Sequence, residues 1–183
     1  MLEPVSKSDL PSDSPLPEGW DDWWRQHSAR LLLFARSQSR SAADAQDVLQ
    51  DALVKIWRGR PDGSCPPLSH VFRAIRQCAI DLGRSIERRR KREDQAVADE
   101  RPIEGVWFQT EPSSAIEADE LESSLRKLNS DQREVIVLKI WGDQTFLEIA
   151  DALSISPNTA ASRYRYGLAE LRRRLGYKKE LSQ

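Results

Sequence analysis

Apolar residues recur at steps of three and four along most of this chain, and this spacing constrains the fold more than any other feature. One such stripe runs from Trp20 to Phe34, a second from Ala45 to Ile56 and a third from Leu68 to Ile86. The spacing places apolar side chains on one face of an α-helix. No alternation of apolar and polar residues is long enough to predict a β-strand. The chain is therefore predicted to be all-α.

The first three helices are expected within residues 19–94, where their apolar stripes can bury one another in a small bundle. The first begins at Trp20, the second covers about 44–58 and the third about 68–90. Gly59, Pro61 and Gly63 stop the second helix. We expect residues 1–18, rich in Pro, Ser and acid, to form a disordered tail.

Four further helices are expected within residues 116–176, after a flexible linker at 95–115, and residues 177–183 form a short tail. These helices cover about 116–128, 130–141, 145–153 and 156–175. Ser130 is the expected N-cap of the second of them, and Thr145 and Glu148 form a capping box for the third. Ser156 followed by Pro157 starts the fourth. The fold class is thus two small helical domains joined by a linker.

The chain is nearly neutral, but its charges are segregated. It has 28 Lys and Arg residues against 29 Asp and Glu residues. Six basic residues and one acidic residue lie at 84–92, and seven basic residues and one acidic residue lie at 163–179. Between these blocks, residues 99–122 hold eight acidic residues and one basic residue. Two basic patches separated by an acidic segment are typical of proteins that bind nucleic acid.

Other classes of protein find little support in the sequence. No apolar run approaches the ~20 residues of a membrane span, and the N-terminus is not a secretory signal. Two cysteines cannot form a disulfide framework, which fits the cytoplasm. Neither a Gly-rich phosphate loop nor a G-x-S-x-G motif is present, so no enzyme is expected. His27, His70, Cys65 and Cys78 lack metal-ligand spacing, so neither metal nor cofactor is expected.

The helices at 145–153 and from 156 onward are separated only by Ser154 and Ile155, which predicts a helix-turn-helix. Ala150 is small enough for the two helices to cross closely, and Ser154 occupies the turn position where Gly is usual. The second helix would enter the major groove, because Asn can read adenine and Arg can read guanine. Its candidate DNA contacts are Ser156, Asn158, Thr159, Ala161, Ser162, Arg163 and Arg165.

Three stretches of this chain resemble a known family. Residues 44–58, DAQDVLQDALVKIWR, resemble the core-binding helix of region two in bacterial sigma factors, which typically reads DAEDLVQETFLRAWR. Residues 76–82, RQCAIDL, resemble a later region-two segment, RNLAIDL. Residues 128–135, LNSDQREV, are similar to LPPEQREV at the start of region four, and 148–150 and 159–163 resemble its EIA and TVKSR stretches. Two regions with only a linker between them is the layout of the extracytoplasmic-function (ECF) group of sigma-70-type factors.

The resemblance implies a protein that makes core RNA polymerase specific for promoters. Region two would dock on the clamp of the largest polymerase subunit through Asp44, Gln46, Asp47, Gln50, Asp51 and Lys55. It would melt and bind the downstream promoter element through His70, Arg73, Arg76, Gln77, Arg84 and Arg88. Region four would read the upstream element with the helix from Ser156 and meet the polymerase flap. An anti-sigma factor is a further implied partner.

The sequence departs from the family pattern at several positions. His70 stands where Trp is frequent, Gln77 where Asn is frequent and Ala161 where Lys is frequent. The first two positions imply an unusual downstream element, and the third implies one missing contact to DNA.

Two alternatives remain open on the sequence alone. One is a stand-alone helix-turn-helix regulator that binds duplex DNA as a dimer. The other is a protein-interaction module that makes no use of its basic residues. We also expect Trp20, Trp23, Trp24, Trp57, Trp107 and Trp141 to serve in core packing rather than in stacking on bases.

Overall fold

The computed structural model describes residues 19–60, 62–92, 107 and 115–176. Its helices are α1 (Trp20–Gln38), α2 (Ala42–Arg58), α3 (Leu68–Arg92), α4 (Ala115–Arg126), α5 (Ser130–Ile140), α6 (Phe146–Leu153) and α7 (Pro157–Arg174). The described residues contain no strand, so the all-α prediction is confirmed. The expected tails at 1–18 and 177–183 lie outside the described residues, as does the expected linker apart from Trp107 and the first residue of α4.

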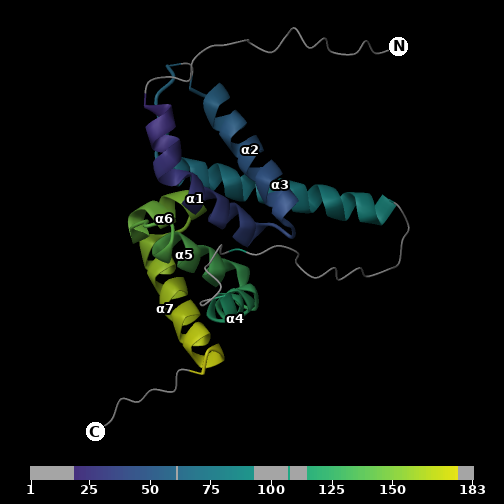
Figure 1. Ribbon diagram of the computed structural model, residues 1–183, viewed down its shortest axis with the longest axis vertical. Coiled ribbons are helices and arrows are strands. Elements are labelled where there is room, and N and C mark those ends of the chain that lie inside the picture. Colours follow the sequence, from purple (N-terminus) through teal and green to yellow (C-terminus); the bar gives the residue numbers. More distant parts are fainter. Residues whose placement is uncertain (1–18, 61, 93–106, 108–114, 177–183) are drawn as a thin grey trace.

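The N-terminal helices α1, α2 and α3 form a bundle (Figure 1). The rings of Phe34 and Phe72 are fully buried in its core. These two rings meet edge to face with their centroids 5.2 Å apart, a favoured aromatic geometry. Val48 of α2 and Ile75 of α3 are also fully buried there. The stripes expected from the sequence therefore provide this core.

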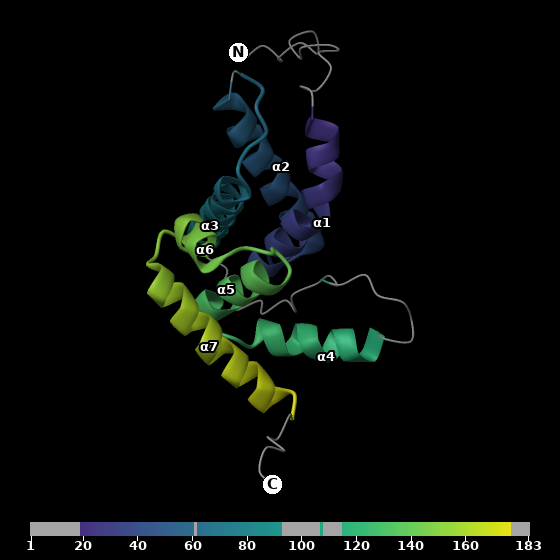
Figure 2. The same cartoon turned by 90° about the vertical axis from the view of Figure 1, so that its left-hand side faces the viewer.

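The C-terminal helices form a second unit, in which α7 packs along α5 and α6 and also meets α4 (Figure 2). Leu125, Ile136, Leu138 and Ile149 are fully buried in it. Gly167, in the middle of α7, allows the close approach of α5, because a β-carbon there would lie 2.6 Å from Cδ1 of Ile136. The position of the last helix is therefore set by a residue that has no side chain.

Side-chain caps begin four of the helices. The Ser41 and Ser156 side chains accept hydrogen bonds from the Asp44 and Thr159 amides, and Thr145 forms the expected capping box with Glu148. The expected cap at Ser130 is wrong, because Asn129 occupies that position and its side chain accepts from the Asp131 amide. Both residue types are good N-caps, and they are adjacent in the sequence.

The two helical units pack against each other. The first helix of the helix-turn-helix, α6, lies on α3, and α5 lies beside α1 (Figures 1 and 2). Buried residues of both units form one continuous hydrophobic cluster. The sequence predicts two units but contains no sign of this contact between them.

Trp107 connects the two units. Its side chain is buried, and its ring lies under the guanidinium of Arg126, 4.8 Å from the ring centroid. The Trp107 backbone N–H donates to Glu122 of α4 at 2.6 Å, and its carbonyl accepts from Arg36 of α1 at 3.1 Å. We call this set of contacts the Trp107 clasp.

The expectation that all six tryptophans serve in the core is wrong for two of them. Trp24 is 38% exposed and Trp57 is 48% exposed, whereas Trp20 and Trp107 are buried. Trp23 and Trp141 are half-buried and pack against the core. Within the part of the chain that the structure describes, no helix is both long enough and apolar enough to span a bilayer.

Candidate nucleic-acid interface

The turn between α6 and α7 has the geometry that a helix-turn-helix requires. Ser154 adopts the left-handed conformation with φ 55°, and the Ile155 amide donates to the Ala150 carbonyl at 3.0 Å. This backbone geometry closes the C-terminus of α6 and turns the chain into the next helix. Ala150 is buried between the helices, as its small size predicts.

The outward face of α7 carries most of the candidate DNA contacts. Asn158 and Arg165 are exposed, and Thr159, Ala161 and Ser162 are half-exposed. Ser156 is exposed as the N-cap, and its hydroxyl lies 2.8 Å from that of Thr159. Hydroxyl, amide and guanidinium groups on one exposed helical face can read base edges in the major groove.

Tyr166 belongs to the same face, and the sequence reasoning missed it. It is 62% exposed, and the guanidinium of Arg165 lies over its ring, 5.5 Å from the centroid. Its spacing of four from Ser162 places it one helical turn further along, and that spacing is the signal that could have identified it.

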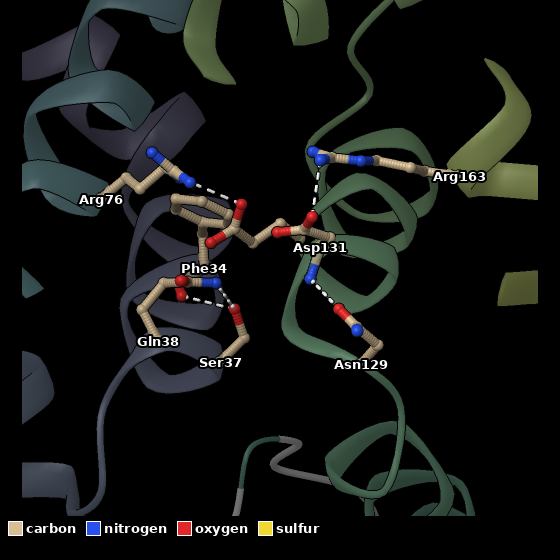
Figure 3. A network of polar contacts seen from close by, with 8 residues as sticks. Phe34, Ser37, Gln38, Arg76, Asn129, Asp131 and Arg163 are labelled. Carbon is tan, nitrogen blue, oxygen red and sulfur yellow. Dashed lines mark hydrogen bonds and ion pairs between the residues drawn. The ribbon is translucent and has the colours of Figure 1, made fainter. Parts of the chain in front are cut away.

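Arg163 points toward α5 and is paired there. Its Nη2 lies 2.5 Å from Oδ2 of Asp131, near the N-terminus of α5 (Figure 3). The side chain is about one-quarter exposed. The pair orients Arg163 at the edge of the recognition face and joins α7 to α5.

The candidate downstream-element residues lie along α3. His70, Arg73, Gln77, Arg84 and Arg88 are exposed, and Gln77 donates to Asp81 one turn away at 3.0 Å. An open depression lies beside Arg84 and Arg88 on the C-terminal half of the helix, and it is lined by Ile80, Asp81, Gly83, Arg84, Glu87 and Arg88.

Two arginines of α3 meet carboxylates of the C-terminal unit. Arg73 binds both the side chain and the backbone carbonyl of Asp151 on α6, with Nη2 2.5 Å from Oδ1. Arg76 reaches toward α5, where its Nε lies 3.0 Å from Oε2 of Glu134 (Figure 3). The sequence could not reveal these pairs, because their partners lie 78 and 58 residues away.

Burial governs the electrostatics of the second pair. The side chain of Glu134 is 6% exposed, and burial raises its pKa above the ordinary value although Arg76 acts in the opposite direction. The pKa of Asp151 is lowered, first by a hydrogen bond from Ser69 and further by Arg73. The half-exposed pair therefore favours ionised Asp151, whereas the buried pair holds a carboxylate that ionises less readily.

The polar face of α2 is open. Gln46, Asp47, Gln50, Asp51 and Lys55 are exposed, whereas Asp44 is half-buried in the first turn. Beside this face lies an apolar groove of about 300 Å³ lined by Trp20, Trp24, Leu53, Val54 and Trp57, together with Asp21. The sequence reasoning missed the groove because it assigned its tryptophans to the core. An acidic face next to an exposed apolar groove suits a protein partner.

The described residues contain no candidate metal-binding site. No group of three or more His, Cys, Asp or Glu side chains is placed to hold an ion there, and Cys65 and Cys78 are unpaired.

The C-terminal unit is a helix-turn-helix with an exposed recognition helix, and the N-terminal bundle carries a basic helix and an acidic face. Together they indicate a DNA-binding transcription protein with two units. The models of two family regions match these two units. "Sigma-70 region 2" matches residues 23–92, and "Sigma-70, region 4" matches residues 118–171. The chain therefore belongs to the sigma-70 family, and curated relatives named as ECF sigma factors place it in the ECF group.

Curated relatives cover most of the chain. It is 28% identical over 159 residues to the ECF RNA polymerase sigma factor SigM of Mycobacterium tuberculosis, which covers 86% of this chain and 78% of SigM. It is 32% identical over 157 residues to the RNA polymerase sigma-E factor of Streptomyces avermitilis, which covers 85% and 84% of the two chains. The resemblance inferred from the motifs is confirmed.

Solved structures show the same fold. The sigma factor RpoE of Bartonella quintana, in complex with the anti-sigma factor NepR, matches with a TM-score of 0.63 and 25% identity, covering 87% of this chain and 99% of RpoE. CnrH, in complex with the cytosolic domain of CnrY, matches with a TM-score of 0.61 and 24% identity, covering 87% and 89%.

Proposed function

We propose that this ECF sigma factor binds core RNA polymerase through α2 and directs it to promoters through α3 and α7. The observation that carries the proposal is the placement of three exposed surfaces on one chain: an acidic face on α2, a basic helix and a recognition helix. The α2 face and the basic helix α3 lie within the match to region 2, and the recognition helix α7 lies largely within the match to region 4. The protein works by binding and uses no catalytic residues, and its place of action is the cytoplasm.

Docking on the polymerase clamp uses the exposed polar side of α2. Asp47, Gln50 and Asp51 recur at helical spacing and can bind basic and polar groups of a facing coiled coil. The groove lined by Trp24 and Trp57 supplies apolar area beside them. Asp44, Gln46 and Lys55 complete this face.

Melting of the downstream element uses α3. Extruding a base costs a few kcal/mol, and a pocket that binds the extruded base offsets the cost. His70 and Gln77, which depart from the usual residues, lie on the exposed side of α3. Arg73, Arg76, Arg84 and Arg88 supply the charge for the phosphates, a contribution that falls with rising salt.

Recognition of the upstream element uses α7. Asn158, Ser162 and Arg165 face outward. We add Tyr166 to the residues proposed to contact the upstream element, because it lies on the same face of α7. Ala161 supplies no charge at its position. The flap of the polymerase meets this unit on another face.

An inhibitor protein is a further proposed partner. Both solved relatives described above are complexes with a second protein, in one case named as an anti-sigma factor. The open α2 face and its groove offer such a partner a surface that overlaps the polymerase site.

Reconstituted transcription tests the proposal. Core polymerase from the source bacterium is mixed with the full chain and genomic fragments, and the transcript starts are sequenced. Defined starts that share two spaced upstream elements are expected, and core polymerase alone is the control. Specific binding of duplex DNA by the free protein, with no defined starts, would instead favour a stand-alone regulator.

A further inference from the structure

The apolar groove between the start of α1 and the end of α2 is built symmetrically by the two helices. Each helix contributes residues at positions i, i+1 and i+4, namely Trp20, Asp21 and Trp24 of α1 and Leu53, Val54 and Trp57 of α2. This spacing places the three residues of each helix on one face. The groove holds about 300 Å³, and Asp21 is the one charged residue in its lining. We call it the Trp24–Trp57 groove.

Two tryptophans of this groove have both ring surface and a polar edge available to a ligand. Trp24 is 38% exposed and Trp57 is 48% exposed. Trp20 is buried, and its indole N–H donates to the Gly63 carbonyl at 2.8 Å. Within the described part of the chain, the indole N–H groups of Trp24 and Trp57 have no acceptor. A ligand that suits this groove therefore combines apolar groups with hydrogen-bond acceptors.

A polyproline II segment has this combination of groups. It forms no internal hydrogen bonds, so its backbone carbonyls are free to accept from outside. Pro-rich segments dock in aromatic-lined grooves and lose little conformational entropy, because their backbone is already extended. An α-helix uses its own carbonyls along its length and offers none to an indole N–H. The two free indole donors thus favour a polyproline II ligand over a helical one.

A short Pro-rich segment precedes the groove in the sequence. Residues 14–17 read Ser-Pro-Leu-Pro, and they lie outside the described part of the chain. Each of the four is a proline or stands directly before a proline, so steric restrictions favour an extended or polyproline II backbone at every position. Pro15, Leu16 and Pro17 supply three consecutive apolar side chains.

The short distance along the chain gives this segment an advantage over any free ligand. Ser14 stands six residues before Trp20, so the two cannot lie farther apart than roughly 20 Å. A tether of this length gives an effective concentration on the order of millimolar, which a free ligand of equal affinity has to match. Gly19, the N-cap of α1, has a φ of 89°, and this left-handed conformation allows the chain to change direction just before Trp20.

We propose that residues 14–17 fold back into the Trp24–Trp57 groove as a polyproline II segment, with their carbonyls accepting hydrogen bonds from the two indole N–H groups. The inference goes beyond the proposed function and does not depend on it, because it concerns the free chain and is tested without polymerase or DNA. A protein partner that uses the groove has to displace this segment first.

The test compares the full chain with a Leu16→Ser/Pro17→Ala variant. The first substitution removes an apolar side chain, and the second removes the restriction on the backbone of the residue before it. The matched control is Pro4→Ala/Val5→Ser, which makes the same kinds of change earlier in the chain. Both pairs lie outside the helices of the structure, so circular dichroism should be the same for all three proteins.

Nuclear magnetic resonance of the chain with ¹⁵N-labelled tryptophan reads the groove directly. The indole N–H signals of Trp24 and Trp57 are assigned with phenylalanine variants. We expect nuclear Overhauser effects from these two rings to the side chains of residues 15–17 in the wild type and in the control. The Leu16→Ser/Pro17→Ala variant should lose them and shift both signals, whereas buried Trp107 should not move. Absence of these effects in the wild type, or identical signals in the two variants, would overturn the proposal.

A synthetic peptide of residues 10–18 provides a second readout. It should bind the Leu16→Ser/Pro17→Ala variant at Trp24 and Trp57 several-fold more tightly than it binds the control, because the groove of the control is already filled. Equal binding, or no binding to either protein, contradicts the inference. Signals of Trp24 and Trp57 that shift with protein concentration, and not with the substitutions at residues 16 and 17, would assign the groove to a second copy of the chain instead.

Discussion

Gly167 of α7 and Ile136 of α5 lie so close that a β-carbon on the glycine would stand 2.6 Å from Cδ1 of the isoleucine and 3.1 Å from Cβ of Gln132. This contact fixes how deeply the recognition helix sits against the rest of region four. It also makes a glycine in the middle of a helix a requirement of packing rather than a weakness.

Replacing Gly167 with alanine is therefore expected to lower the free energy of unfolding by about 1–2 kcal/mol, the cost of overpacking less the gain in helix propensity. Gly83 of α3 is the matched control, because a β-carbon there meets nothing within 4 Å. Gly83→Ala should raise stability by about 0.5–1 kcal/mol. Urea denaturation measures both, and a gain in stability for Gly167→Ala would contradict the packing argument.

Replacing Ser154 with glycine is expected to stabilise region four by about 1 kcal/mol, because its φ of 55° is unfavourable for residues with a β-carbon. The same substitution at Ser123, on the exposed side of α4, should destabilise by a few tenths of a kcal/mol. Thermal unfolding of the two variants should shift in opposite directions. Shifts of the same sign would show that the left-handed conformation at position 154 is not unfavourable for serine.

Replacing Asp47 with arginine is expected to weaken binding to core polymerase at least tenfold, about 1.4 kcal/mol, because it reverses a charge on the proposed docking face. Glu120→Arg makes the same change in charge on α4 and should leave the affinity unchanged. Fluorescence anisotropy with labelled factor measures both. Equal affinities for the two variants would remove Asp47 from the interface.

Replacing Arg163 with alanine is expected to weaken upstream-element recognition by about 1–3 kcal/mol if its free donors make a bidentate contact with a base. Its ion pair with Asp131 raises a second possibility, namely that Arg163 only positions α7. Asp131→Asn separates the two roles, because it removes the partner and keeps the arginine. Promoter-dependent transcription should fall for Arg163→Ala alone, and an equal fall for Asp131→Asn would assign Arg163 a positioning role.

The contribution of Glu134 to the free energy of unfolding should change with pH in the opposite direction to that of a carboxylate whose pKa is lowered by folding. Burial raises the pKa of Glu134 above its ordinary value of 4.5, so the folded chain binds this proton more tightly than the unfolded chain. Its stabilising contribution is full below pH 4.5 and is lost as the pH rises through the raised pKa. The difference in unfolding free energy between the wild type and Glu134→Gln should therefore favour the wild type more in acid than at neutral pH. A difference that moves the other way would show that Arg76 outweighs burial.

Local features of the fold were predictable from the sequence. The stripes from Ala45 to Ile56 and from Leu68 to Ile86 gave helices close to their observed bounds, and the Thr145–Glu148 capping box was correctly identified. These signals lie within a few residues of one another, as helical periodicity and capping require. The helix-turn-helix followed from them.

Features that depend on distant partners were not predictable. The sequence predicted that Arg73 and Arg76 contact DNA but could not show that they form ion pairs with Asp151 and Glu134. Periodicity also placed Trp24 on an apolar helical stripe, and Trp57 was expected in the core as well, yet both are exposed among the residues that the structure describes. Which face is covered is decided by the packing of whole helices, and no local pattern records it.

The Trp107 clasp divides the span between the two promoter-reading regions into unequal parts. With the clasp closed, region four is tied to the bundle at a residue only fifteen positions beyond Arg92, the end of α3, whereas α4 begins twenty-three positions beyond it. At about 3.3–3.6 Å per residue, fifteen residues can span at most roughly 50 Å and twenty-three residues at most roughly 80 Å. Release of Trp107 therefore raises by about half the greatest distance to which the chain allows the two regions to separate.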